Sequence, residues 1–406
     1  MQTILHMQRI IITTILCFSM SVLSNAQIEN YKFGKGLSFT NKDSTFSMKA
    51  AFRFQSLFAN EWTVRDDDFG YVEDHVSAFL IRRSRLKFDG FALTPKLHYK
   101  LELGLSNRDI QNTDVNYFGN SSNFVFDAYF DYKFHKNFSI LIGQTKLPGN
   151  RERVISSGDM QMVDRSLLNS RFNLDRDMGM QLKYFAKLGS QFELKMTGAF
   201  SQGEGRNVIA DNVGGYEYTL RAELYPFGAF KSKGDYVGSD ISREQKPKLA
   251  VGFTFDLNQD AGRNRGNLGS FLSSDAQLKD LRSGFIDMMF KYKGFSMMGE
   301  FAIRGTEDDN PLVYDSNGTK VGTYYTGSAI NLQAGYLFKK NYEFAFRYTK
   351  LRTQNSSVGQ DEDQYTIGYS KYIVGHKLKI QTDLGYYKRA NKDDGLEWRL
   401  QFDFHL

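Results

Sequence analysis

The sequence predicts an all-β protein, a transmembrane antiparallel β-barrel of about 16 strands with long extracellular loops. Residues 396–406 give the clearest observation, because every even-numbered residue in this stretch is apolar and every odd-numbered residue is polar. Alternation with a period of two places these sets on opposite faces of one strand. About ten residues tilted at about 45° are enough to span a bilayer. The same alternation recurs from Ser44 to the end of the chain.

The composition agrees with a barrel. The chain contains 35 Phe and 23 Tyr, yet its mean hydropathy is −0.46, as expected when half of every strand faces water. There are 5 prolines in 406 residues, which suits continuous ladders of hydrogen bonds. The net charge of +6 is too small and too dispersed to predict nucleic-acid binding.

The N-terminus has the features of a secretory signal. Arg9 precedes an apolar stretch, and Ser24 and Ala26 supply the small residues of a signal-peptidase site. An uncleaved anchor is the alternative, although the apolar run is short for one. Cys17, the single cysteine, lies within this segment, so the mature chain should contain no disulfide and no cysteine metal ligand. The expected divisions are 1–26 (signal peptide), 27–43 (short N-terminal periplasmic segment) and 44–406 (transmembrane barrel).

About sixteen alternating segments follow one another along the mature chain. Their approximate spans are 44–58, 75–90, 95–106, 124–134, 138–146, 177–187, 191–202, 216–227, 247–258, 284–294, 295–305, 326–338, 341–352, 363–374, 376–388 and 396–406. Short turns and long polar connections alternate between them, which is the layout of periplasmic turns and extracellular loops in outer-membrane barrels. Residues 228–246 are the exception, since this connection is long where a short turn is expected. It indicates either a missed pair of strands or a real periplasmic excursion.

Four stretches of the mature chain occur in an order shared with one known family. They are residues 36–49, 79–90, 126–149 and 164–179. Through them the chain resembles the phosphate-selective porin O and P family of outer-membrane porins. The resemblance implies a sixteen-stranded barrel, usually a homotrimer, with the third loop folded into the lumen. It also implies that the paired arginines Arg82 and Arg83 line the constriction. The family name records phosphate selectivity in some members and does not establish the substrate here.

The second predicted strand carries a change of phase. Its apolar residues are odd-numbered up to Ile81 and even-numbered from Leu86, and a β-bulge would produce this change by inserting one residue. Arg82, Arg83 and Arg85 would then all point into the lumen. Without the bulge, Arg82 would face lipid at a cost of about 2–4 kcal/mol. The three arginines are either an anion-contacting cluster or wall residues neutralised by lumenal carboxylates. The carboxylates considered are Glu102, Asp127 and Asp131.

The long segment 147–176 is the candidate for the constriction loop. It contains Arg151, Arg153, Arg165, Arg171 and Arg176. An excess of arginine fits an anion filter built from basic side chains. The alternative is that ion pairs among Asp164, Arg165, Asp175, Arg176 and Asp177 pin the loop to the wall.

The predicted lumen carries charges of both signs. The basic residues are Lys100, Lys183, Lys195, Arg221, Arg304, Arg347, Lys379 and Arg399, and the acidic ones are Glu193, Glu223, Glu300, Glu343, Asp383 and Glu397. Interleaved charges suit a general pore, and they weaken the inference of phosphate specificity. Acidic clusters at 66–68, 307–309 and 361–363 lack the spacing of a calcium loop.

These observations predict a passive porin of the bacterial outer membrane for small hydrophilic solutes, with a modest preference for phosphate-like anions. A general, non-selective diffusion porin is the alternative, and an outer-membrane enzyme or an adhesin ranks below both. We expect no catalytic residues, because the five mature histidines form no HExxH or similar pattern. We also expect no metal and no cofactor. The expected partners are outer-membrane lipid, small anionic or polar solutes and two further copies in a homotrimer, without nucleic acid.

Overall fold

The computed structural model describes residues 33–65, 72–110, 123–208, 212–354 and 357–406. The expected signal peptide lies outside this part of the chain. The barrel strands are β2 (Phe46–Val64), β3 (Val72–Ala92), β4 (Thr94–Gly104), β5 (Val125–Tyr132), β6 (Phe138–Lys146), β7 (Arg176–Leu188), β8 (Phe192–Ser201), β9 (Glu217–Tyr225), β10 (Lys248–Asn258), β11 (Leu281–Tyr292), β12 (Phe295–Thr306), β15 (Gly327–Leu337), β16 (Tyr342–Thr353), β17 (Glu362–Tyr372), β18 (Leu378–Arg389) and β19 (Asp394–His405).

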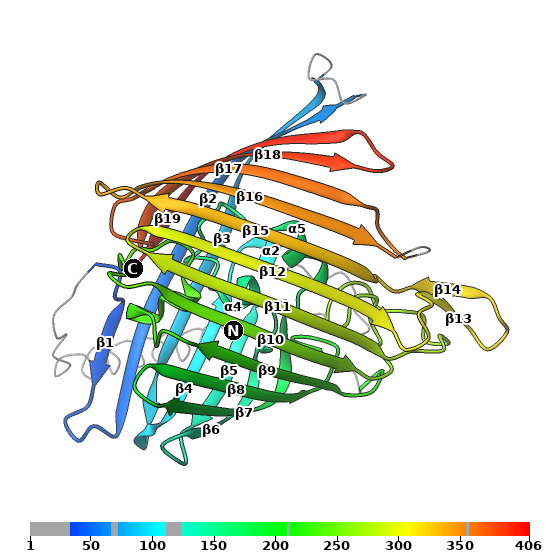
Figure 1. Cartoon of the computed structure of the whole chain (residues 1–406). Helices are drawn as coiled ribbons and strands as arrows, with labels where there is room; N and C mark the ends of the chain where they lie inside the picture. Colours follow the sequence, from blue (N-terminus) through cyan, green and yellow to red (C-terminus); the bar gives the residue numbers. More distant parts are fainter. Residues whose placement is uncertain (1–32, 66–71, 111–122, 209–211, 355–356) are drawn as a thin grey trace, which may run out of the picture.

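These sixteen strands form a closed antiparallel ring (Figure 1). Each pairs with the next along the chain, apart from β12, which pairs with β15 across a loop. The last strand, β19, pairs with β2 from Arg53↔His405 to Val64↔Asp394 and closes the ring. Closure satisfies the backbone groups where lipid offers no hydrogen bonds. The predicted sixteen-stranded barrel is confirmed.

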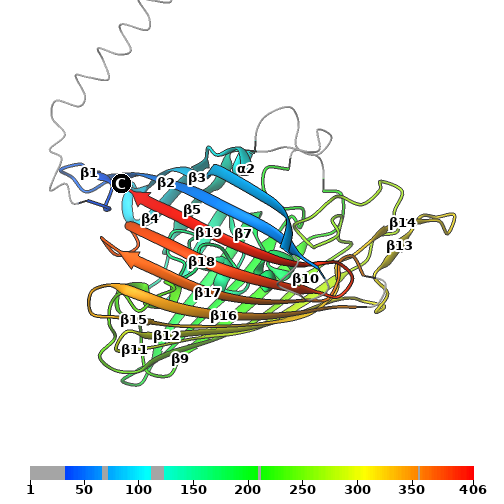
Figure 2. The ribbon, with the colours of Figure 1, turned by 90° about the horizontal axis from the view of Figure 1, so that it is seen from above.

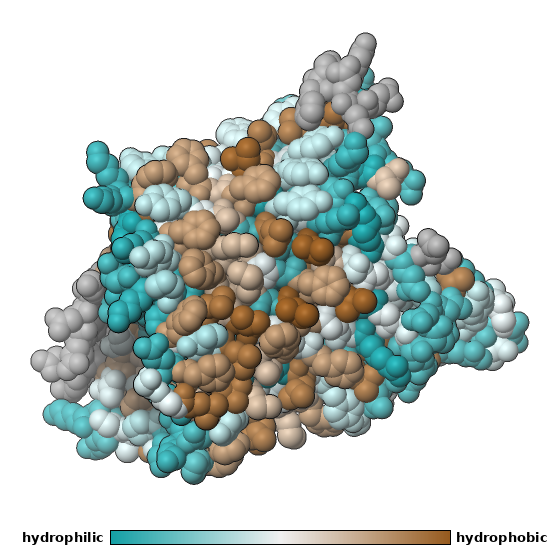
Figure 3. All heavy atoms as spheres, in the orientation of Figure 1, coloured by the Kyte–Doolittle hydropathy of each residue, from teal (hydrophilic) through white to brown (hydrophobic). Residues whose placement is uncertain are grey.

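The outer surface carries the apolar half of the alternation. Phe79, Ile142, Leu220 and Ile367 are each more than half exposed. Figure 3 shows such side chains as a band across the strands, with hydrophilic side chains at both ends. We call the end where Phe33 contacts Phe404 (ring centroids 5.5 Å apart) the turn side, and the opposite end the loop side. In the described ranges, no helix is long and apolar enough to cross a membrane.

A short additional strand, β1 (Leu37–Thr40), precedes the barrel. It pairs with Ser47–Ala50 of β2, next to the point where β19 ends (Figure 2). These residues belong to the expected N-terminal periplasmic segment, for which no strand is predicted from the sequence.

The predicted β-bulge lies in β3 at Arg82. Gln55 of β2 pairs with Arg83, and the next residue, Ser56, pairs with Ile81, so Arg82 is the inserted residue. The bulge reverses the phase of the strand. Ile81 is therefore exposed on the outer face, while Arg82, Arg83 and Arg85 all line the internal cavity.

Most long connections lie on the loop side. One of them contains the hairpin of β13 (Leu312–Tyr314) and β14 (Lys320–Thr323), which projects from the barrel in Figures 1 and 2. The connection between β9 and β10 lies on the turn side. These two strands pair directly from Leu224↔Val251 to Glu217↔Asn258, so no pair of strands is missing. Residues 226–247, with the 3-10 helix η1 (Lys231–Tyr236), are a real excursion that turns back into the barrel. We call them the inserted turn.

The third loop, residues 147–175, folds into the lumen, as the resemblance implied. We call it the constriction loop. Its helices are α4 (Arg151–Val154) and α5 (Leu167–Phe172). Two apolar clusters hold it inside the barrel. One joins Leu147, Leu168, Phe172 and Leu174 to wall residues that include Ala302 and Ala329. The other joins Ile155 and Met160 to the inserted turn and to Met289 and Met298.

Candidate functional site: the lumenal cavity and its charged wall

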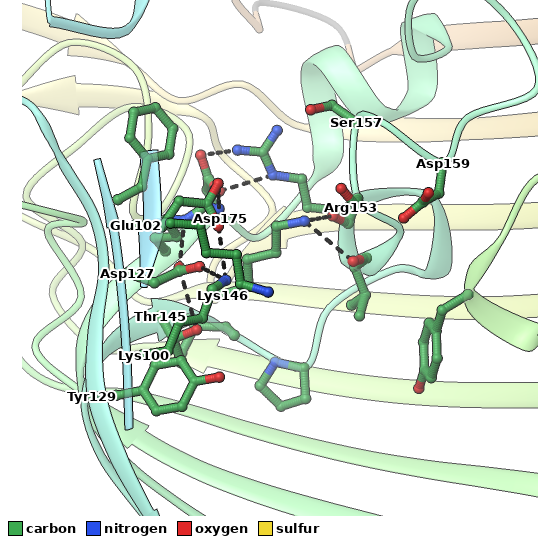
Figure 4. A pocket seen from close by; sticks show the side chains of 18 of the residues that line it. Lys100, Glu102, Asp127, Tyr129, Thr145, Lys146, Arg153, Ser157, Asp159 and Asp175 are labelled. Carbon is green, nitrogen blue, oxygen red and sulfur yellow. Dashed lines mark hydrogen bonds and ion pairs between the residues drawn. The ribbon is translucent and has the colours of Figure 1, made fainter. Parts of the chain in front are cut away.

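A cavity of about 1190 Å³ lies between the constriction loop and the wall formed by β2–β9. Figure 4 shows Lys100, Glu102 and Asp127 on the wall strands, and Ser157 and Asp159 on the constriction loop. Among the described residues, none between 237 and 376 lines this cavity. The constriction loop and the inserted turn therefore cover the inner faces of β10–β12 and β15–β17, and the open path follows the other side of the barrel.

The charged residues that line the cavity are predominantly basic. In the described part of the chain they include 20 lysine and arginine side chains and 7 aspartate and glutamate side chains. This excess arises because most of the predicted lumenal basic residues line the cavity, whereas most of the predicted lumenal acidic residues do not. Among the eight predicted basic positions, five line the cavity, namely Lys100, Lys183, Lys195, Arg221 and Arg399. Among the six predicted acidic positions, only Glu223 does.

The other acidic side chains of the predicted lumen are partly used to hold the constriction loop. Glu300 accepts a hydrogen bond from the backbone N–H of Glu152 at 2.6 Å. Glu343 accepts one from Gln161 Nε2 at 2.7 Å, and Asp383 accepts one from the backbone N–H of Val163 at 3.2 Å. Charges of both signs line the cavity, as predicted, but basic side chains outnumber acidic ones there because the loop covers these carboxylates.

Arg82 and Arg83 contact the constriction loop across the cavity. Arg82 Nη2 lies 2.6 Å from Asp164 Oδ2, and Arg83 Nη2 lies 3.2 Å from Asp164 Oδ1. Arg83 Nη1 also donates to Gln55 Oε1 at 2.9 Å. Burial alone would raise the pKa of Asp164, but the two guanidinium groups outweigh it and hold this pKa well below its usual range. Asp164 is therefore ionised and neutralises part of their charge.

Arg85 has two carboxylate partners. Its guanidinium lies 3.0 Å from Glu102 Oε1 and 3.0 Å from Asp109 Oδ1. The predicted partner Glu102 is thus present, whereas Asp127 pairs with Lys100 and Arg176 and Asp131 pairs with Lys183. Arg82, Arg83 and Arg85 all line the cavity, and each is paired with a carboxylate. This arrangement matches the alternative in which the three arginines are wall residues neutralised by lumenal carboxylates.

Arg151 takes a different position from the predicted one. Its side chain is fully buried, and its Nε and Nη2 donate to Asp287 Oδ1 at 2.8 Å and to Glu223 Oε1 at 3.0 Å. Arg151 Nη1 donates to the backbone oxygen of Asp235 at 3.1 Å. Arg171 also lies outside the cavity wall, with Nη2 4.0 Å from Glu362. Neither side chain faces the open path.

Arg153 and Arg176 do line the cavity. Arg153 Nε donates to Asp175 Oδ1 at 2.9 Å, and Arg176 Nε donates to Asp127 Oδ1 at 2.7 Å. Of the ion pairs proposed among residues 164–177, Asp175 with Arg176 is present at 3.5 Å. Asp177 instead accepts a hydrogen bond from the backbone N–H of Gly203 at 2.6 Å.

A second group of cations is held by backbone carbonyls instead of carboxylates. Lys146 Nζ donates to the carbonyls of Arg153, Val154 and Ile155 at 2.7, 3.2 and 3.3 Å, at the end of α4. Arg165 Nη2 donates to the same Ile155 carbonyl at 2.7 Å. The two cationic groups therefore converge on one oxygen, and both line the cavity.

Arg206 is the third cation of this kind. Its guanidinium donates to the carbonyls of Asn123 and Asp109, each at 3.0 Å, and it also lines the cavity. Within the described residues, Lys146, Arg165 and Arg206 make no ion pair with a carboxylate. Burial lowers the pKa of Arg165 to about 9 and that of Arg206 to about 10, so both remain charged at neutral pH. A carbonyl dipole orients a cation without cancelling its charge, so the charges of Arg165 and Arg206 are left for a solute.

The arginines of the cavity wall are further ordered by one aromatic ring. The guanidinium carbons of Arg85, Arg206 and Arg176 lie 3.7, 3.9 and 4.8 Å from the centre of the Phe126 ring. Stacking of this kind favours guanidinium groups and fixes their planes. Sequence reasoning did not single out Lys146, Arg206 or Phe126. Phe126 is the inserted residue of a second bulge, opposite Glu102 and Leu103, and no break in the alternation of β5 marks it.

The described residues contain no cluster of three or more His, Cys, Asp or Glu side chains arranged to hold a metal ion. Two of the acidic loop clusters use ion pairs instead. Asp308 pairs with Lys279 at 2.6 Å, and Asp363 pairs with Arg352 at 3.0 Å. The cluster at 66–68 lies outside the described residues.

Comparison with known proteins supports a porin. The family model described as phosphate-selective porin O and P matches residues 54–289. An uncharacterised protein of Aquifex aeolicus is 24% identical over 362 residues, which cover 81% of each chain.

Solved porin structures share the fold. The outer-membrane channel DcaP of Acinetobacter baumannii has a TM-score of 0.53 at 12% identity, covering 90% of this chain and 99% of that one. An anion-selective porin from Comamonas acidovorans has a TM-score of 0.52 at 10% identity, with 89% and 100% covered. OmpF of Salmonella typhi, solved with daunomycin, has a TM-score of 0.53 at 12% identity, with 90% and 99% covered.

Proposed function

Since the chain belongs to the phosphate-selective porin O and P family, and so is a channel protein of the bacterial outer membrane, we propose that it is a passive porin with a modest anion preference. The solutes are small and hydrophilic, with phosphate-like oxyanions among those favoured. The family and the fold are those of a channel, so we do not propose an enzymatic role.

The observation that carries this proposal is the set of cations held by carbonyls, Lys146, Arg165 and Arg206. An oxyanion in the cavity loses part of its hydration and needs donors and positive charge in return. The arginines of ion pairs offer donors but little net charge, because carboxylates lie within 4.0 Å of them. Lys146, Arg165 and Arg206 all offer donors, and Arg165 and Arg206 add net positive charge, so anions should be enriched beside them.

A general diffusion porin is the second candidate, and a specific observation favours it. Arg82 and Arg83, which the resemblance places at the constriction, and the nearby Arg85 all pair with carboxylates. If these ion pairs dominate the field across the opening, the pore sorts solutes by size alone.

We also propose that the protein is a homotrimer, the assembly that the family resemblance implies. The mass of the detergent-solubilised protein, measured by light scattering with the detergent contribution subtracted, should equal three chains. A single-chain mass would contradict the trimer without bearing on the pore.

The test of the function is the reversal potential of the purified mature protein in a planar bilayer under a KCl gradient. We expect a reversal potential whose sign shows that chloride is more permeant than potassium. We also expect added phosphate to reduce the chloride current. A potential near zero with full conductance would support the general porin instead. Absence of conductance from protein that migrates differently before and after boiling, as a folded barrel does, would refute both.

A further inference from the structure

The inserted turn, residues 226–247, meets the constriction loop inside the barrel. The backbone N–H of Gly238 donates to the carbonyl of Asp159 at 2.7 Å, and Arg151 of the loop donates to the carbonyl of Asp235. The approach is very close, because a Cβ atom on Gly238 would lie 2.5 Å from the backbone nitrogen of Gln161. One segment enters from the turn side and the other from the loop side, and they join within the lumen.

The barrel wall also holds the inserted turn through hydrogen bonds. Lys291 of β11, which is 1% exposed, donates through Nζ to the carbonyls of Val237 and Ser239, each at 2.7 Å. Asp240 accepts a hydrogen bond from the backbone N–H of Gly294 at 2.8 Å. Buried ammonium groups with such partners keep a segment in one place, because releasing them would leave a buried charge without hydrogen bonds.

An apolar core lies between the two segments and the wall. Phe230 of the inserted turn packs with Ile155 and Met160 of the constriction loop and with Met289 and Met298 of the wall. These wall side chains point inward, where a water-filled pore would carry polar residues. At this place the wall is therefore suited to packing against the inserted turn and the constriction loop and not to facing water.

The inserted turn also changes the charge of the open path. Asp235 Oδ2 lies 3.2 Å from Lys195 Nζ and accepts a hydrogen bond from Tyr225 at 2.8 Å. Tyr236 donates its hydroxyl to Glu223 Oε2 at 2.5 Å and lines the cavity beside it. Tyr236 therefore covers the single acid among the six predicted lumenal acids that reaches the cavity.

We propose that the inserted turn is a second constriction element, which acts from the turn side together with the constriction loop. It closes the side of the lumen in front of β10–β12, fixes the position of the loop through Asp159 and Arg151, and covers Glu223. Solutes are then confined to the basic wall of β2–β9. The inference rests on the proposed channel function. It holds that residues 226–247 help to set the width of the pore and part of its ion selectivity.

Two variants test the assignment. In the first, residues 228–246 are replaced by a short glycine-serine turn that joins β9 to β10. In the second, Gly238→Leu places a side chain against Gln161 and separates the inserted turn from the loop, while every charged residue is kept. Gln245→Ala is the matched control, because Gln245 is exposed in the same segment and its side chain donates a hydrogen bond to the carbonyl of the neighbouring Arg243.

Single-channel conductance and reversal potential are measured for each protein. We expect conductance to roughly double in the deletion variant, since the closed side of the lumen opens and current follows the open cross-section. We expect the anion preference to decrease in both variants and to be unchanged in Gln245→Ala. If the deletion variant does not fold, Gly238→Leu decides alone. Wild-type conductance and potential in a folded Gly238→Leu protein would overturn the inference and leave the porin function standing, whereas a wild-type protein without conductance would overturn the function itself.

Discussion

Replacement of the two basic residues beside α4 should reduce the anion preference of the pore. The change is the double substitution Lys146→Gln and Arg165→Gln. Glutamine keeps an N–H donor for the carbonyls of residues 153–155, which Lys146 and Arg165 now satisfy, so the loop should stay in place. The positive charges are lost while most of the hydrogen bonding is retained.

The size of the effect follows from the distances in the site. Both cations contact the carbonyl of Ile155, so an anion beside one is close to the other. A charge about 4 Å away contributes about 1 kcal/mol at the dielectric constant of water and ~4 kcal/mol at an effective value near 20. With the lower figure, the charge of Arg165 alone amounts to about 1 kcal/mol, and each 1.4 kcal/mol is a factor of ten. The ratio of anion to cation permeability should therefore fall by roughly fivefold or more.

The assay is the reversal potential in a KCl gradient, with Arg171→Gln as the matched control. Arg171 belongs to the same loop and loses the same charge, but it lies outside the cavity wall. Its substitution should leave the potential unchanged. An unaltered potential in the double variant, with normal conductance, would show that Lys146 and Arg165 do not face the permeating ions and would refute the reasoning.

Two further predictions concern stability. Arg151→Ala should destabilise the barrel interior by about 3–5 kcal/mol, because it leaves the buried carboxylates of Asp287 and Glu223 without one of their cations; urea unfolding in detergent measures this loss, and an unchanged midpoint would contradict it. Burial raises the pKa of Glu204, a loop residue, to about 7 from its ordinary value of 4.5, so the folded protein retains this proton over that range and stability should fall as pH rises through it. Amide exchange at residues 203–206, corrected for its intrinsic pH dependence, should therefore be faster at pH 8 than at pH 5, and Glu204→Gln should remove the difference; an equal difference in that variant would exclude Glu204 as the cause.

The barrel was predictable because its strands repeat one local rule. Lipid outside and water or polar protein inside force the alternation on every strand. The pattern located all sixteen strands with ends within three residues, except that β2 continues to Val64, six residues beyond its predicted end. The bulge at Arg82 was predictable for the same reason, since a change of phase between Ile81 and Leu86 has few structural causes.

The site was less predictable because its contacts join distant parts of the chain. Arg151 and Asp287 are 136 residues apart, and no local pattern shows that they meet. The sequence marks the length of residues 226–247 but not the direction in which they fold. Inward-facing Met289 and Met298 were the available signal, since apolar residues on the polar face of a membrane barrel indicate that protein covers them.

The short strand β1 has a consequence for where this barrel begins. β2 continues past the end of β19, so the backbone groups of residues 47–50 would have no partner on that flank without β1. An unpaired flank of this kind invites pairing with another chain. Residues 37–40 therefore pair with the otherwise free edge of β2, at the seam where the first and last barrel strands meet, and protect it from pairing with another chain. A shortened protein that starts at Ser44 would keep all sixteen strands and lose this protection, so aggregation at the seam is its expected defect.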